Sequence, residues 1–161
     1  MQFSDKRTLT RWLIILTSFL IVVLIVWNTY NFFQIFKNEE RVKMELWSTA
    51  QTTINNANEN TDLDLAFKIM GNNTSIPMIL TMPNDSIINH NNIEEEIASD
   101  PKQLEKELKR LKSENTPIKM VITESDYQLV YYGNSPLLNK LKYYPIALLL
   151  IIILFAAVVY N

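Results

Sequence analysis

Residues 140–161 have the sequence KLKYYPIALLLIIILFAAVVYN, and this stretch sets the fold class. Its sixteen residues from Pro145 to Tyr160 include eleven Leu, Ile, Val or Phe residues and no charge. Such a run favours the hydrocarbon interior of a bilayer as a helix. Tyr143 and Tyr144 precede the run and Tyr160 closes it, as is typical of aromatic anchors at the two membrane interfaces. We therefore expect a transmembrane helix over residues 143–161.

The start of this helix has two interpretations. Pro145 suits the first helical turn, where its missing N–H is not needed. Alternatively, the preceding SPLLNKLKYYP begins a helix at Ser135 and Pro136, which then kinks at Pro145.

A second apolar block, RWLIILTSFLIVVLIVWNTYNFF, lies near the N-terminus at residues 11–33. Residues 12–30 carry no charge, and twelve of these nineteen residues are Leu, Ile, Val or Phe. A helix of about 20 residues spans the hydrocarbon core, with Trp12 and Trp27 as interface anchors here. The run exceeds the apolar core of about 7–15 residues of a signal peptide, and no small-residue cleavage site follows. We interpret it as an uncleaved transmembrane anchor.

The segment between the two blocks is polar, rich in Asn and charged, whereas 48% of the whole 161-residue chain is hydrophobic. This uneven distribution is typical of a membrane protein with a small soluble insert. The net charge of −2 gives no reason to expect a nucleic-acid partner. The chain has no cysteine, which excludes disulfides, thiolate zinc sites and cysteine catalysis. A small domain without disulfides suits a bacterial envelope.

Positive residues predict the orientation. Lys6, Arg7 and Arg11 lie in a short tail before the first span and favour the cytoplasm. The positive residues after that span belong to a long loop, and such loops cross membranes largely regardless of charge. We expect a cytoplasmic tail at residues 1–11, spans at 12–30 and 143–161, and an extracytoplasmic domain at 31–142. The expected location is the bacterial inner membrane, as a multi-pass protein in contact with lipid.

The sequence after the first span has no helix breaker before about Asn58, so its helix should continue into the insert. Glu40 and Lys43 interrupt an apolar stripe along that helix. The stripe pairs with a second subunit as a coiled coil, or it packs on the domain behind it; the second interpretation is favoured. Its members are Phe33, Phe36, Trp47, Ala50, Ile54 and Ala57.

The rest of the insert predicts an α+β domain. A helix in residues 61–71 should end at Gly71 as its C-cap, and SIPMILTM and DSIINHN should be strands around a PND turn. Ser99 or Asp100 should cap a helix that Pro117 stops. PIKMVITESDYQLVYYG should form a hairpin that turns at residues 124–126. About four antiparallel strands with helices on one side fit this order.

Chemical motifs are few. The single histidine, His90, precedes the glutamates at 94–96 without defined metal-ligand spacing, and a surface histidine is the better interpretation. Ser135 lacks the setting of a nucleophile elbow. Tyr127, Tyr131 and Tyr132 either line a ligand pocket or pack in the core of the sheet, and the core is the commoner place. We therefore expect no catalytic, cofactor-binding or metal-binding residues in this chain.

Three segments resemble the N-terminal sensory part of two-component sensor histidine kinases from Bacteroidetes. They are GNNTSIPMILTMPNDSIINHNNI, PKQLEKELKRLKSENTPIKM and YQLVYYGNSPLLNKLKYYPIALL. The resemblance extends from about Phe33 to Asn161, and its most specific part runs from Tyr131 to Pro145. It implies a PAS-like extracytoplasmic domain between two spans. One departure is the turn MPND, where the family more often has Asp and Gly.

The resemblance also implies a function. The chain would be the input region of a kinase and would form a homodimer. Its partner would be a cognate response regulator, and only a kinase part beyond Asn161 would bind ATP and Mg²⁺. We expect the reading frame to continue there with Lys or Arg and then a helix carrying a His–Glu pair. His90 is not that histidine, because no Glu follows it directly. The alternatives are a small non-enzymatic membrane anchor or interaction protein, or the input module of a chemoreceptor or cyclase.

Overall fold

The computed structural model of the chain describes residues 2–123 and 126–160, with side chains described at 9–123 and 126–154. The chain divides into two units. One comprises Met1–Ile35 and Lys140–Asn161, and the other, hereafter the folded domain, is Phe36–Asn139. Each unit is described by itself.

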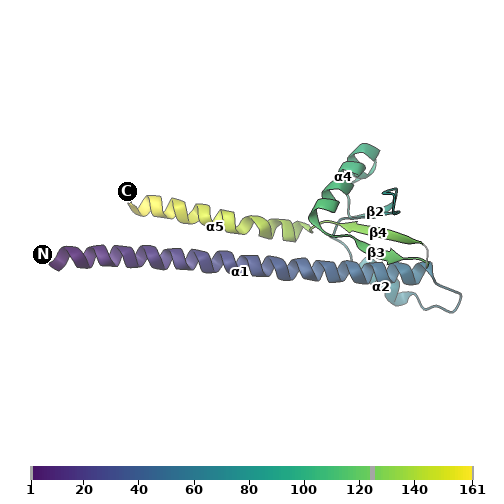
Figure 1. Ribbon diagram of the computed structural model, residues 1–161, viewed down its shortest axis with the longest axis horizontal. Helices are drawn as coiled ribbons and strands as arrows, with labels where there is room; N and C mark the ends of the chain where they lie inside the picture. Colours follow the sequence, from purple (N-terminus) through teal and green to yellow (C-terminus); the bar gives the residue numbers. More distant parts are fainter. Residues whose placement is uncertain (1, 124–125, 161) are drawn as a thin grey trace. The chain divides into compact units, whose positions relative to one another are not determined.

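Two helices supply the first unit and continue into the folded domain (Figure 1). Helix α1 (Gln2–Asn55) has 54 residues, and α5 (Pro136–Tyr160) has 25. Within the described residues, the stretches Leu9–Asn55 and Pro136–Leu154 are long and apolar enough to cross a membrane, judged by length and composition. In their most apolar windows 0% and 6% of the residues are buried, whereas the core helix of a soluble protein is mostly buried.

The start of α5 agrees with the second of the two interpretations, whereas the kink at Pro145 stays a prediction. The helix begins at Pro136, and Pro145 lies inside it. Ser135 precedes the helix, and its side-chain oxygen accepts a hydrogen bond from the backbone N–H of Leu138 at 3.3 Å. This is the geometry of an N-cap, which satisfies one of the free donors of the first turn.

The folded domain is α+β and contains a four-stranded antiparallel sheet, as predicted. Its strands are β1 (Met78–Thr81), β2 (Ile87–Asn91), β3 (Ile118–Val121) and β4 (Tyr127–Tyr132), in the order β2-β1-β4-β3. The two predicted hairpins form the outer pairs. The central pair joins β1 to β4, with Met78 opposite Tyr132 and Thr81 opposite Leu129.

Helices cover both faces of this sheet, so the expectation of helices on one side is wrong. On one face Met44 and Trp47 of α1 pack against Met78, Leu80 and Tyr132. On the other, Leu108 and Leu111 of α4 (Pro101–Glu114) pack against Ile79 and Tyr131. Successive strand residues point to opposite faces. The burial of all four β1 residues is therefore the signature of a strand between two layers. Figure 1 shows α4 and the domain part of α1 on opposite sides of the strands.

The predicted capping residues of the helices are confirmed only in part. Asp100 is the N-cap of α4, and its carboxylate accepts a hydrogen bond from the backbone N–H of Lys102 at 2.9 Å. That bond lowers the pKa of Asp100 below its ordinary value. Helix α2 (Asp64–Gly71) includes Gly71 as its last residue, and the cap is Asn72 in a right-handed conformation, so the predicted Gly71 cap is wrong.

A short helix and two turns complete the domain. The glutamates at 94–96 lie at the start of that helix, α3 (Glu95–Ala98). The β1–β2 turn places Asp85 at φ 66°, and Lys112 of α4 forms an ion pair with it at 2.6 Å. In the β3–β4 turn, Glu124 and Ser125 lie outside the described residues, and Thr123 and Asp126 are joined by backbone hydrogen bonds.

Candidate functional site

The first residues of α5 are tied to α1 through a buried carboxylate. Glu40 is 9% exposed and Ser135 is 4% exposed. The backbone N–H of Ser135 donates a hydrogen bond to Oε2 of Glu40 at 3.2 Å. Because the N-terminus of a helix carries partial positive charge, a carboxylate is favourable there. Glu40 thus joins the two helices within the folded domain.

The end of α4 also binds the backbone just before α5. Oε2 of Glu114 accepts a hydrogen bond from the backbone N–H of Asn134 at 2.8 Å, and its Oε1 pairs with Arg110. A Cβ added at Gly133 would lie 2.6 Å from Leu111 Cδ2 and 2.8 Å from Glu114 Oε2. A side chain at position 133 would therefore force Leu111 and Glu114 to move at this close approach between α4 and the end of β4.

Two basic residues of α1 extend this set of bonds, hereafter the junction. Lys37 Nζ donates to the carbonyl oxygen of Glu114 at 3.2 Å. Arg41 Nη1 donates to Thr116 Oγ1 at 2.9 Å and to the hydroxyl of Tyr132 at 3.5 Å. Burial raises the pKa of Tyr132, and the neighbouring Arg41 opposes that shift. The junction thus links α1, the end of α4, β4 and the start of α5.

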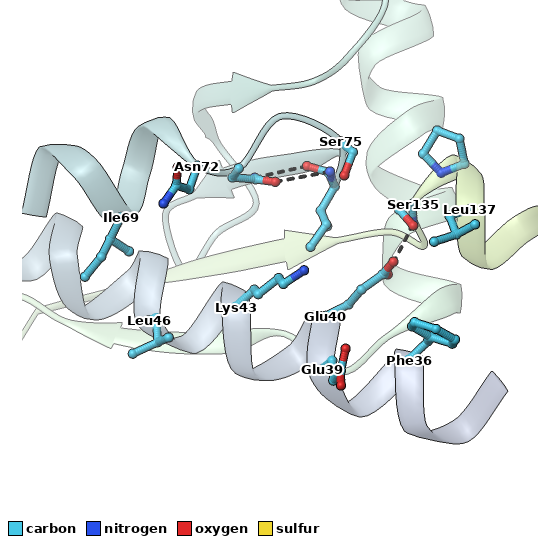
Figure 2. Close-up of a pocket in the computed structure, with 13 residues that line it drawn as sticks. Phe36, Glu39, Glu40, Lys43, Leu46, Ile69, Asn72, Ser75, Ser135 and Leu137 are labelled. Atoms are coloured by element: carbon cyan, nitrogen blue, oxygen red, sulfur yellow. Dashed lines mark hydrogen bonds between the residues drawn. The ribbon is translucent and has the colours of Figure 1, made fainter. Parts of the chain in front are cut away.

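A pocket of about 670 Å³ lies beside the junction (Figure 2). Its walls come from three places in the folded domain: α1, the end of α2 with the loop after it, and the first residues of α5. The lining residues are Phe36, Glu39, Glu40, Lys43, Leu46, Ile69, Asn72, Asn73, Ser75, Ile76, Ser135, Pro136 and Leu137.

Hydrogen bonds hold the loop that forms one wall of this pocket. Asn73 Nδ2 donates to the carbonyl oxygen of Ile76, and the backbone N–H of Ile76 donates to Asn73 Oδ1, each at 3.1 Å. Asn92 Nδ2 donates to the carbonyl oxygens of Asn73 and Ile76 at 2.9 and 3.0 Å. The wall is therefore preorganised, as expected of a formed pocket.

The charged side chains of the pocket differ in whether they form hydrogen bonds or ion pairs. Glu40 is bound to Ser135, as described above. Glu39 and Lys43 are exposed on α1, and neither forms a side-chain hydrogen bond or ion pair within the described part of the chain. Lys43 extends from α1 at the edge of the pocket in Figure 2. One carboxylate and one ammonium group therefore remain free at this site.

The structure places the predicted interface anchors on the two long helices. Trp12 and Trp27 are exposed on α1, and Tyr143 and Tyr144 are exposed on α5. Tyr160 lies in α5, and its side chain is outside the described residues. The four residues with described side chains are not among those that line the pocket or form the junction, and the role of all five as interface anchors stays a prediction.

Of the other residues considered from the sequence as chemical candidates, Ser135 lines the pocket, whereas His90 and the three tyrosines of β4 do not. His90 is exposed on the edge strand β2, and among the described residues no group of three or more His, Asp or Glu side chains is placed to hold a metal. Tyr131 and Tyr132 are buried on opposite faces of the sheet, which confirms their interpretation as core residues. Tyr127 is partly buried, with Lys119 Nζ 4.1 Å from the centre of its ring.

Sequence reasoning missed the junction. Glu40 interrupts the apolar stripe of α1, and that interruption was the only local signal of a buried polar contact. Its partner lies 95 residues away in the sequence, where Ser135 and Pro136 precede an apolar helix. Nothing local connects the two positions. Met44, fully buried in the same stripe, was also missed.

Comparisons with known proteins give no family. No protein-family model, no curated protein and no solved structure matches the chain.

Proposed function

We propose that this chain is the sensory input region of a two-component sensor histidine kinase embedded in the bacterial inner membrane. In this proposal residues 12–30 and 143–161 cross the bilayer, and residues 31–142 form an extracytoplasmic domain of PAS-like type. A cytoplasmic kinase core with ATP and Mg²⁺ follows in the full protein and acts on a response regulator. The sequence resemblance and the two long apolar helices support this proposal.

The hydrogen bond between Glu40 and Ser135 carries the proposal. A sensor must convert a change in its domain into a movement of the helix that leads out of that domain. Glu40 lies on the helix that leads in, and Ser135 caps the helix that leads out. Because both groups are buried, breaking their bond exposes or strands a polar group. In this proposal the start of α5 therefore has two states, one with the Glu40–Ser135 bond formed and one with it broken.

The bonds around this link would set the resting state. Glu114 binds the backbone N–H of Asn134 before α5, and Lys37 of α1 binds the carbonyl oxygen of Glu114 at the end of α4. A stimulus that moves α4 or β4 would therefore pull on the first turn of α5. In the proposed homodimer, two such movements would reach the paired kinase cores.

A chimera tests the function. Residues 1–161 are fused to the cytoplasmic kinase core of a well-characterised sensor kinase, and autophosphorylation is measured in membrane vesicles. We expect Glu40→Gln, which removes only the charge at the helix N-terminus, to change the basal rate roughly two- to fivefold. The control is Glu59→Gln, since Glu59 is exposed in a loop of the same domain. Equal rates in the wild type and both variants would contradict the proposal.

The natural reading frame supplies a second test. A kinase core encoded after residue 161 is the expected result. A stop codon at that point would favour the small membrane anchor instead.

A further inference from the structure

The pocket beside the junction has the size and composition of a ligand site. Its volume of about 670 Å³ falls inside the range of roughly 300–1,000 Å³ of small-molecule sites. Apolar walls come from Phe36, Leu46, Ile69 and Leu137, on three separate elements. Such sites combine apolar walls with a few polar groups that orient the ligand. Here those polar groups include two free charges of opposite sign.

Glu39 and Lys43 are one helical turn apart on α1. In this order, Glu four residues before Lys, the two side chains readily pair on a helix surface. Arg41 and Glu45, also four residues apart on α1 but in the reverse order, form an ion pair at 2.9 Å. Glu39 and Lys43 form no ion pair in the described part of the chain, although both line the pocket. Both charges are therefore open to a ligand.

We infer that this pocket binds a small zwitterion with an apolar part. An ammonium group of the ligand pairs with Glu39, and a carboxylate or phosphate group pairs with Lys43. The apolar part packs against Leu46 and Ile69, and the amide of Asn72 and the hydroxyl of Ser75 are the adjacent polar groups. A free amino acid with an apolar side chain and the phosphoethanolamine headgroup of a lipid share this chemistry.

The binding itself does not depend on signalling. A consequence that rests on the proposed function is that the ligand is the stimulus, or a modulator of it. Ser135 and Leu137 line the pocket and lie at the start of α5. Glu40 lines it as well, so an occupant contacts the link between the two helices directly.

The full 161-residue chain in detergent micelles provides the first test. Leucine and phenylalanine are titrated by isothermal calorimetry, with leucinamide and isovaleric acid as controls that each lack one of the two charges. We expect saturable binding of at least one amino acid with a Kd below about 1 mM, and no binding of either control.

The second arm distinguishes the lipid source. The chain is placed in bilayer nanodiscs of phosphatidylethanolamine or of phosphatidylglycerol, and the unfolding temperature of the domain is measured. A headgroup ligand stabilises the native state by mass action. It should raise the midpoint in the ethanolamine lipid only. Binding in either arm supports the site and identifies which source supplies the zwitterion.

Matched variants locate the site. Lys43→Gln and Glu39→Gln each remove one charge from the pocket, and each should weaken binding at least tenfold. Lys106→Gln and Glu96→Gln remove equally exposed charges elsewhere in the domain and should leave binding unchanged. Far-UV circular dichroism checks that all four variants fold. Because both pocket residues are exposed and form no side-chain bond within the described residues, their replacement should not disturb the fold.

Two results would overturn the inference. The first is the lack of saturable binding in both arms, and the second is binding that Lys43→Gln and Glu39→Gln leave unaltered. The kinase chimera reports separately. Ligand binding without any change in phosphorylation would keep the site and reject its role in signalling, whereas a Glu40 effect without binding would keep the function and reject the site.

Discussion

The carboxylate of Glu40 accepts a hydrogen bond from the backbone N–H of Ser135 at 3.2 Å, across 95 residues of sequence. One residue lies in a 54-residue helix and the other immediately precedes a 25-residue helix. Both are buried in the folded domain, and both also line the pocket beside the junction. The stability of the domain and the position of the first turn of α5 therefore depend on the same contact.

Replacing Glu40 by Ala should destabilise the domain. The substitution leaves the buried N–H of Ser135 without an acceptor, which typically costs about 1–3 kcal/mol. Glu40→Gln keeps an acceptor oxygen and loses only the charge at the helix N-terminus, worth roughly 0.3–1 kcal/mol. Urea unfolding of the full chain in micelles measures both, with exposed Glu59→Gln as the control. Equal stabilities for Ala and Gln would show that the hydrogen bond contributes little.

Gly133→Ala should lower the free energy of unfolding by about 1–3 kcal/mol, because overpacking a close contact forces neighbours to move. The new methyl group would meet Leu111 at 2.6 Å. Gly71→Ala is the matched control. Gly71 lies in α2, and a Cβ added there has no neighbouring atom within 4 Å. Alanine in that helix should be neutral or stabilise by up to about 1 kcal/mol. Thermal unfolding followed by circular dichroism compares the two, and similar effects would argue against the tight contact.

Truncation of Met44 tests whether α1 is part of the core. Its side chain is fully buried against the sheet, so Met44→Ala should cost about 2–5 kcal/mol. Val42, on the same helix and 46% exposed, is the control, and Val42→Ala should cost less than about 1 kcal/mol. Chemical unfolding gives both values. A small effect at Met44 would mean that this part of α1 does not pack on the sheet.

Acid should weaken the cap of α4. The hydrogen bond from the backbone N–H of Lys102 lowers the pKa of Asp100 in the folded state below its ordinary value of about 3.8. The charged carboxylate then stabilises the fold above that value, and this contribution disappears as the pH falls through the lower folded pKa. Asp100→Asn keeps a capping oxygen without titrating. The unfolding midpoint of the wild type should therefore fall relative to Asp100→Asn below about pH 4, and an unchanged difference would refute the assignment.

Single cysteines test the proposed topology, since the chain has none of its own. A cysteine that replaces the exposed Glu94 should react with a membrane-impermeant maleimide in spheroplasts, whose inner membrane is intact. A cysteine at Ser4 should react only after permeabilisation, because residues 1–11 are assigned to the cytoplasm. The opposite labelling pattern would reverse the proposed orientation.

Local patterns in the sequence determined the elements of this protein. The apolar blocks gave the two long helices, the turn residues between β-rich runs gave both hairpins, and Asp100 with Pro101 marked the start of α4. These features depend on neighbours a few residues apart, so a single sequence contains them. The membrane spans and the sensory role remain predictions.

Only the tertiary structure decided how the layers and the candidate site assemble. The four residues of β1 could not show locally that α1 and α4 would each cover one of their faces. Glu40 interrupts an apolar stripe, and its acceptor role exists only because the fold brings Ser135 beside it. The pocket combines residues 36–46, 69–76 and 135–137. Contacts between such distant segments depend on how the helices pack against the sheet. The local periodicity of the sequence does not specify that packing.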